Sequence, residues 1–162
     1  MQGQIISLDA PIIPDEGLGG LTVRTRIRDI QDVFTGLSIT KEGSFNLVSP
    51  FDARYHLQKG EVTVSVDVRN GKVFMLSAGN GYRGLLFGKI FVGMKVEDAI
   101  NAEPKLYYDE AEEMILCEGC EGLSLDIPEI DPPVELVPEM TISAINVFAQ
   151  ETRTLKGQQG EW

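Results

Sequence analysis

A run of alternating valines is the feature that most limits how this chain can fold. The run lies in EVTVSVDVRNGKVFMLSA (residues 61–78), where four valines alternate with polar residues: Val62, Val64, Val66 and Val68. Alternation with a period of two is typical of a β-strand with one buried face. Asn70 and Gly71 suit the two positive φ angles of a type I′ turn, so the segment predicts a β-hairpin that returns through Val73 and Met75.

The chain also resembles itself at a distance of 69 positions. That shift aligns GGLTVRTRIRDIQDV, which starts at Gly19, with GKIFVGMKVEDAINA, which starts at Gly88. Each copy predicts a short extended segment and then a helix of about ten residues, beginning near Thr25 or Lys95. Thr25 is a candidate N-cap of the first helix, and Pro104 is a candidate stop for the second.

Strands are expected after the second helix as well. EGLSLDIPE (residues 121–129) matches the first valine strand, and TISAINVF (residues 141–148) matches the strand that returns from it. In this copy the tight turn is replaced by an acidic, proline-rich connection, IPEIDPPVELVPEM.

These patterns predict an α+β fold in which two degenerate helix-plus-antiparallel-strand repeats form one domain with a mostly antiparallel sheet. We expect that domain to span residues 1–150, with half-repeats at about 17–80 and 81–149. Residues 151–162 are expected to form a polar C-terminal tail, mobile unless its last residue, Trp162, is docked.

The negative charge of the chain is regional. Residues 1–100 carry 11 Lys or Arg and 11 Asp or Glu, whereas residues 101–162 carry 3 and 14, giving a formal net charge of -11. Such a surface repels nucleic acid and anionic membranes, so we expect neither as a partner. It favours a basic protein partner. The N-terminus shows no signal-peptide pattern, and the expected location is the cytoplasm.

Two cysteines at CEGC spacing, Cys117 and Cys120, suggest a zinc site or a redox dithiol. A structural zinc needs four ligands, and the chain has no further cysteine and a single histidine, His56. Two reduced cysteines in or near a strand are the favoured interpretation. For His56 we favour a structural or surface role, because no nucleophile motif accompanies it.

The acidic residues of the second half allow two interpretations. A solvated acidic turn between strands is one, and a partner-binding surface is the other. A calcium loop is not expected, because the EF-hand spacing is absent.

One segment carries a family resemblance. NGYRGLLFGKIFVGMKVEDAI (residues 80–100), followed by a tyrosine-rich acidic stretch, a Gly-Leu strand and the closing TISAINVF, resembles the small cytoplasmic immunity proteins of bacterial toxin systems. The resemblance covers about Gly81 to Phe148. It implies a protein that neutralises a cognate basic toxin domain, such as a nuclease, by occluding the substrate cleft of the toxin.

We therefore expect a non-catalytic acidic binding protein, with no cofactor, no metal site and no catalytic residues. A small hydrolase or metal-dependent enzyme that uses clustered carboxylates is an alternative, as is a structural or oligomerisation module. The expected partner-binding residues are Tyr107, Tyr108, Asp109, Glu110, Glu112 and Glu113, extended by Glu118, Glu121, Glu129, Asp131 and Glu135.

Overall fold

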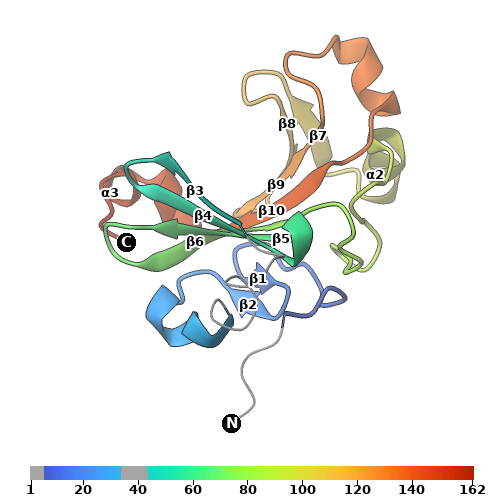
Figure 1. Ribbon diagram of the computed structural model, residues 1–162. Coiled ribbons are helices and arrows are strands. Elements are labelled where there is room, and N and C mark those ends of the chain that lie inside the picture. Colours follow the sequence, from blue (N-terminus) through green and yellow to red (C-terminus); the bar gives the residue numbers. More distant parts are fainter. Residues whose placement is uncertain (1–5, 34–43) are drawn as a thin grey trace.

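An eight-stranded antiparallel sheet forms the centre of the molecule (Figure 1). The computed structural model describes residues 6–33 and 44–162. Strand order across the sheet is β3-β4-β5-β6-β10-β9-β8-β7. In chain order the strands are β3 (Ser44–Ser49), β4 (Asp52–Leu57), β5 (Val62–Asp67), β6 (Lys72–Ala78), β7 (Leu106–Asp109), β8 (Met114–Cys117), β9 (Leu123–Asp126) and β10 (Ala144–Phe148). The predicted α+β class and antiparallel sheet are confirmed.

Two four-stranded meanders meet at the centre of this sheet. Strands β3 to β6 form one meander and β7 to β10 the other, and they join where β6 pairs antiparallel with β10. Ile145 lies opposite Ala78 at this seam, and Asn146 lies opposite Ser77. In Figure 1 the two meanders diverge from the seam like two arms.

Short elements surround the sheet. A small hairpin, β1 (Gly17–Leu18) with β2 (Leu21–Thr22), packs under β6 and β10 (Figure 1). Its two-residue turn is Gly19-Gly20, and both glycines have positive φ, as a tight hairpin turn requires. The helices are η1 (Ile27–Ile30), η2 (Gln58–Gly60), α2 (Val96–Ala102), η3 (Val134–Glu139), η4 (Gln150–Arg153) and α3 (Leu155–Gln158).

The hydrophobic core lies on one face of the sheet. Val62, Val64 and Val66 point into it, as the alternating pattern predicts, and the β1–β2 hairpin closes it with Leu18 and Leu21. Fully burying a side chain of this size stabilises the fold by roughly 1.5–3 kcal/mol. The opposite face of the sheet carries polar residues at alternate positions, such as Ser65, Ser124 and Asn146.

The β5–β6 hairpin forms, but not with the predicted turn. Asp67 pairs with Lys72, so the connection has four residues, and Gly71 is its only residue with positive φ. A bulge near Ser65 then shifts the register. We expected Met75 to lie on the buried face of the returning strand. That prediction is wrong, because a bulge moves each following side chain to the other face of the sheet.

One of the two predicted helices is shorter than expected. The second helix is α2, which ends at Ala102, two residues before Pro104. In the first half the N-cap of η1 is Arg26, and the Thr25 hydroxyl bonds the Thr22 hydroxyl instead at 2.8 Å, so the predicted Thr25 cap is wrong. The end of this first helix lies outside the described residues.

The C-terminal segment is docked on the first meander. The indole Nε1 of Trp162 donates a hydrogen bond of 3.1 Å to the Asp67 carboxylate. Lys72 lies over the indole ring, and Arg69 donates a hydrogen bond to the carbonyl of Gln158. The segment therefore packs against the sheet. In the described part of the chain, no helix is long and apolar enough to cross a membrane.

Candidate functional site

Six carboxylates lie on the β7–β8 turn and on the start of the β9–β10 connection that is bonded to it, and we call this group the acidic tip: Asp109, Glu110, Glu112, Glu113, Glu129 and Asp131. The Asp109 carboxylate accepts hydrogen bonds of 3.0 Å from the backbone N–H groups of Ala111 and Glu112, which sets the hairpin turn. Glu113 then accepts a 3.0 Å bond from the backbone N–H of Asp131. That bond ties the β9–β10 connection to the hairpin, so two stretches of the predicted surface become one.

Tyr108 lies in the middle of the acidic tip. Burial raises the pKa of its hydroxyl most, and four carboxylates around it raise the pKa further: Glu113, Asp131, Glu110 and Asp109. These four carboxylates lie near the Tyr108 hydroxyl, because Coulombic interactions between partly exposed groups fade within about 10 Å. The acidic tip is thus a focused negative surface.

The described part of the chain supplies no ion pair to this surface. Among residues 6–33 and 44–162, no Lys or Arg side chain forms an ion pair with a carboxylate of the acidic tip. Other carboxylates are paired in the same structure, for example Asp15 with Arg24 and Glu103 with Lys89. The tip carboxylates are therefore available to external cations.

Exposed apolar side chains accompany the charges on the β9–β10 connection. Ile130 is 89% exposed, and Val134 and Leu136 are also exposed. They alternate with carboxylates, since Glu129 and Asp131 flank Ile130. In Figure 1 this connection and η3 project from the end of the second meander. Apolar groups presented to solvent among charges are typical of a protein-binding surface.

The predicted contact surface does not form one continuous patch. Glu118 and Glu121 lie in the β8–β9 turn, whereas Glu113 lies at the other end of β8. Glu118 follows Glu113 by five positions, which is roughly 16 Å in extended backbone. Glu135 lies in the first turn of η3, four residues after Asp131 in the chain. Tyr107, on β7, is exposed. The sequence prediction thus grouped residues that lie at opposite ends of β8.

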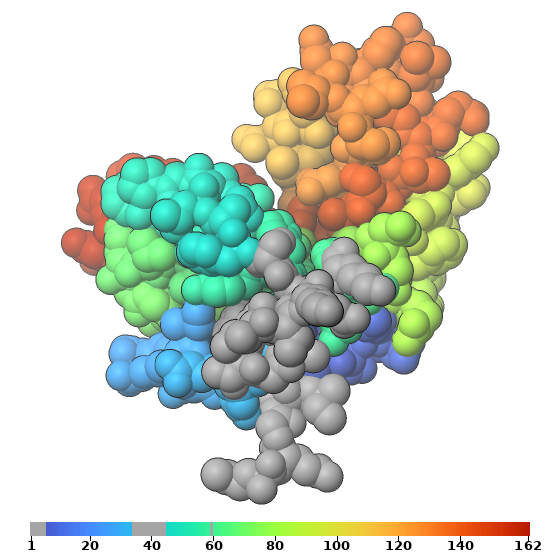
Figure 2. Space-filling view, viewed as in Figure 1, coloured from blue at the N-terminus to red at the C-terminus, as the bar shows by residue number. Residues whose placement is uncertain are grey.

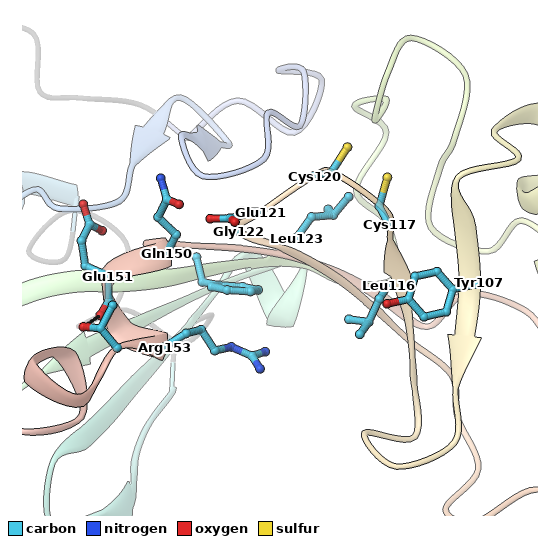
Figure 3. A pocket seen from close by; sticks show the side chains of 12 residues that line it. Tyr107, Leu116, Cys117, Cys120, Glu121, Gly122, Leu123, Gln150, Glu151 and Arg153 are labelled. Carbon is cyan, nitrogen blue, oxygen red and sulfur yellow. Dashed lines mark hydrogen bonds between the residues drawn. The ribbon is translucent and has the colours of Figure 1, made fainter.

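Tyr107 instead borders a hollow of about 660 Å³ at the Glu118 end of the second meander (Figure 3). Leu116 and Phe148 supply apolar walls, and Cys117 and Cys120 line the same space. The Arg153 guanidinium lies 4.8 Å from the centre of the Phe148 ring. This site is lined by aromatic side chains, by Cys117 and Cys120, by one cation and by the carboxylates of Glu121 and Glu151.

A second hollow, of about 490 Å³, continues over the open face of the sheet and shares Phe148 and Arg153 with the first. Its floor is polar, with Asn146 donating a 3.3 Å hydrogen bond to the Ser124 hydroxyl. Figure 2 shows the molecule hollowed between its two arms. Our sequence prediction missed Phe148, Arg153 and Asn146. For Asn146 the sequence holds a signal, because polar positions alternate with apolar ones in TISAINVF and in EGLSLDIPE.

His56 stands apart from all of these groups. Its ring nitrogens bond the Thr63 hydroxyl at 3.1 Å and the Asn46 side-chain oxygen at 2.6 Å, within the first meander. This agrees with the structural role favoured from the sequence. Over the described residues, no group of three or more His, Cys, Asp or Glu is placed to hold a metal ion.

Comparison with known proteins identifies a fold. No family model and no curated protein matches the chain. The structure is similar to the crystal structure of the uncharacterized protein YfeY from Escherichia coli, with a TM-score of 0.56 and 14% sequence identity. The match covers 84% of this chain and 98% of YfeY. At this identity the likeness concerns the fold alone.

Proposed function

We propose that this protein binds a basic protein partner through the acidic tip and the exposed apolar residues of the β9–β10 connection. The observation that carries the proposal is the gathering of unpaired carboxylates around Tyr108, beside the exposed side chain of Ile130. A carboxylate that has no ion pair within the protein can bind a Lys or Arg of the partner without first breaking one.

Charge and apolar surface would contribute differently to such binding. A focused negative potential raises the association rate above the unsteered range of about 10⁵–10⁶ M⁻¹s⁻¹. Apolar side chains that become buried slow dissociation, because a few well-buried anchors carry most of the binding energy. Ile130, Val134 and Leu136 are the candidate anchors, and Glu110, Glu112 and Glu129 are the candidate steering charges.

The resemblance to immunity proteins supplies the partner class. The partner would be a bacterial toxin domain, such as a nuclease, whose substrate cleft is basic and is occluded by the acidic tip. A cytoplasmic location belongs to this proposal, because that is where such a toxin would reach its substrate. Speed of association matters here, since an unneutralised toxin is lethal.

A charge-reversal variant tests this proposal. Glu110→Lys/Glu112→Lys/Glu129→Lys changes only exposed carboxylates whose side chains hold no part of the fold together. The matched control, Glu16→Lys/Asp98→Lys/Glu161→Lys, makes the same change in net charge elsewhere on the surface.

The measurement is the association rate with a basic toxin domain encoded next to this protein's gene, at low and high salt. We expect the tip variant to associate at least tenfold more slowly at low salt and to lose most of its salt dependence, while the control changes far less. Equal rates for the two variants would overturn the proposal.

We also propose that the two halves are copies of one ancestral unit. Backbone hydrogen bonds recur 69 residues apart: Arg24 N–H to Val73 O and Gly93 N–H to Ile142 O, then Ile27 N–H to Gly71 O and Val96 N–H to Met140 O. In both copies the segment that leads into the helix bonds to the chain near the start of the last strand of its meander, β6 or β10. A chain made of residues 81–149 twice in tandem is expected to fold cooperatively, and a chain that stays unfolded would count against the proposal.

A further inference from the structure

Strand β3 forms one of the two edges of the eight-stranded sheet (Figure 1). Within the residues that the structure describes, β3 pairs with β4 on one side and with no strand on the other. Its outward backbone N–H and C=O groups are therefore open to another strand. An edge of this kind is a template for pairing with a second chain.

Apolar side chains continue up to this edge on the core face of the sheet. Leu47 lies opposite Ala53, which in turn lies opposite the core residue Val66. Phe45, two positions before Leu47, is on the same face, and its ring centroid lies 4.9 Å from that of Tyr55. Ala53 is 3% exposed, whereas Phe45 is 54% and Leu47 63% exposed. The apolar layer of the first meander thus ends in two side chains that face solvent.

The other edge of the sheet, β7, is protected in ways that β3 is not. β7 has four residues and ends at Asp109, in the acidic tip. The backbone N–H of Leu106, its first residue, donates a 3.0 Å hydrogen bond to the carbonyl of Glu103. β3 has six residues, SFNLVS, and none of them is charged. Because short length and charged side chains keep sheet edges from pairing, β3 is the edge suited to an interface.

A bulge limits the part of β3 that can pair. The β3–β4 register shifts between Leu47 and Ser49, and a bulge bends the strand and increases its twist. The regular part is residues 44–47. When two such segments pair antiparallel about a two-fold axis at Asn46, Phe45 of each copy lies opposite Leu47 of the other copy. Residues opposite each other share a face, so this register joins the core faces of the two sheets.

The distribution of charge also favours a second copy as the occupant of this edge. Residues 44–78, which contain the first meander, carry four Lys or Arg and three Asp or Glu, so this arm is nearly neutral. The acidic tip belongs to the β7 end of the sheet, and a β3–β3 contact keeps the tips of two copies at opposite ends of the joined sheet. An uncharged strand offers a charged partner no ion pair, whereas its own copy matches it residue for residue.

We propose that β3 is a dimerisation edge, through which two copies of this chain join their sheets by antiparallel β3–β3 pairing about a two-fold axis. The added strand supplies backbone hydrogen bonds, and burial of Phe45 and Leu47 from both copies supplies hydrophobic stabilisation. Each copy uses this edge once, and the protected β7 edge allows no further growth. Assembly therefore stops at the dimer.

Sedimentation velocity over a wide range of protein concentrations tests this proposal. Wild type should shift from monomer to dimer as the concentration rises. Leu47→Lys places one positive charge from each copy in the interface and should raise the dissociation constant of the dimer at least tenfold. Leu155→Lys, at a position on α3 that is 79% exposed, is the matched control and should dimerise as wild type does. Wild type that stays monomeric at every concentration, or Leu47→Lys that dimerises as tightly as wild type, would overturn the proposal.

Disulfide cross-linking tests the register while Phe45 and Leu47 stay in place. Asn46→Cys puts a thiol on the two-fold axis, where Cβ atoms of opposite residues are about 4.5–5.5 Å apart. Mild oxidation should link Asn46→Cys into a covalent dimer far faster than Asp98→Cys, which puts a thiol at an exposed position of α2. Equal rates of linking would contradict the proposed pairing.

Salt separates this interface from the surface proposed above. The β3–β3 dimer should persist at high salt because its contacts are uncharged, whereas binding through the acidic tip should weaken. Circular dichroism of each variant shows whether its fold is intact. These experiments need no other protein, so their outcome is independent of the function proposed for the acidic tip.

Discussion

The indole Nε1 of Trp162 donates a hydrogen bond to the Asp67 carboxylate across 95 residues of sequence. Asp67 is only 4% exposed, and Arg69 forms a second contact with it at 2.9 Å. A buried carboxylate is tolerated when donors surround it. The last residue of the chain thus completes the environment of a charge at the end of β5.

Removing the indole donor should weaken the fold. Trp162→Phe keeps an aromatic ring but removes the N–H group that faces Asp67, and we expect it to lower the free energy of unfolding by about 1–2 kcal/mol. Urea unfolding followed by circular dichroism measures this as a lower midpoint with an unchanged slope. Leu155→Ala, at an exposed position in the same segment, is the control and should leave the midpoint in place.

Asp67 should make stability depend on pH in the acidic range. Burial acts to raise the pKa of Asp67, but hydrogen bonds from Arg69 and Trp162 outweigh it and hold the pKa below its usual value of 3.8. The stabilisation is therefore fully present above pH 3.8 and is lost as the pH falls from there through the lower pKa of the folded state.

To check this, the free energy of unfolding of Asp67→Asn is compared with that of wild type from pH 6 down to the lowest pH at which both proteins fold. The wild-type advantage should be constant in the upper part of this range and shrink below about pH 4. An advantage that grows as the pH falls would contradict the assignment.

The Tyr82 hydroxyl ties two early segments of the chain together. It donates a 2.6 Å hydrogen bond to the carbonyl of Ala10 and accepts a 2.7 Å bond from the backbone N–H of Gly19. Because Tyr82 is only 3% exposed, Tyr82→Phe leaves a buried N–H without its partner and should cost about 1–3 kcal/mol of stability. Tyr107→Phe removes an exposed hydroxyl and serves as the control, with a change below about 0.5 kcal/mol.

Gly122 should tolerate no side chain. Its φ is 73°, and a Cβ atom would lie 2.6 Å from the Cα of Asp15 and from the carbonyl oxygen of Phe148. Gly88 has a φ of 70° but nothing within 4 Å of its Cβ position. Both Gly→Ala changes carry the backbone strain of about 1–2 kcal/mol, and Gly122→Ala adds a steric clash. Thermal melts should therefore show a clearly larger loss for Gly122→Ala, and equal losses would mean that the clash is relieved by local movement.

Much of the strand content follows from local pattern. The alternating valines of β5 predict a half-buried strand, because burial on one face leaves a period of two in the sequence. The same logic finds β9 and β10. It fails at the Asn70-Gly71 turn, since the side chain of Asp67 accepts a bond from the N–H of Arg69 and selects a longer connection. Local propensity cannot anticipate such a competing hydrogen bond.

The site was predicted in part. The sequence places the acidic residues together because they lie close along the chain, but proximity in sequence does not place them at the same end of a strand. Glu113 and Asp131, 18 residues apart, come together through one hydrogen bond, while Glu118 lies at the far end of β8. The hollow lined by Arg153, Phe148 and Cys120 could not be predicted from the sequence, since its walls come from separate strands and a 3-10 helix.

From the sequence by itself came the antiparallel α+β class, the concentration of charge in residues 101–162 and the buried face of the first valine strand. These properties depend on composition and on neighbours within a few positions. Tertiary structure alone decided which carboxylates share a surface, which residues line the hollow beside Phe148 and where Trp162 docks. Those outcomes depend on contacts between residues far apart in the chain, and such contacts are set by the packing of the whole sheet.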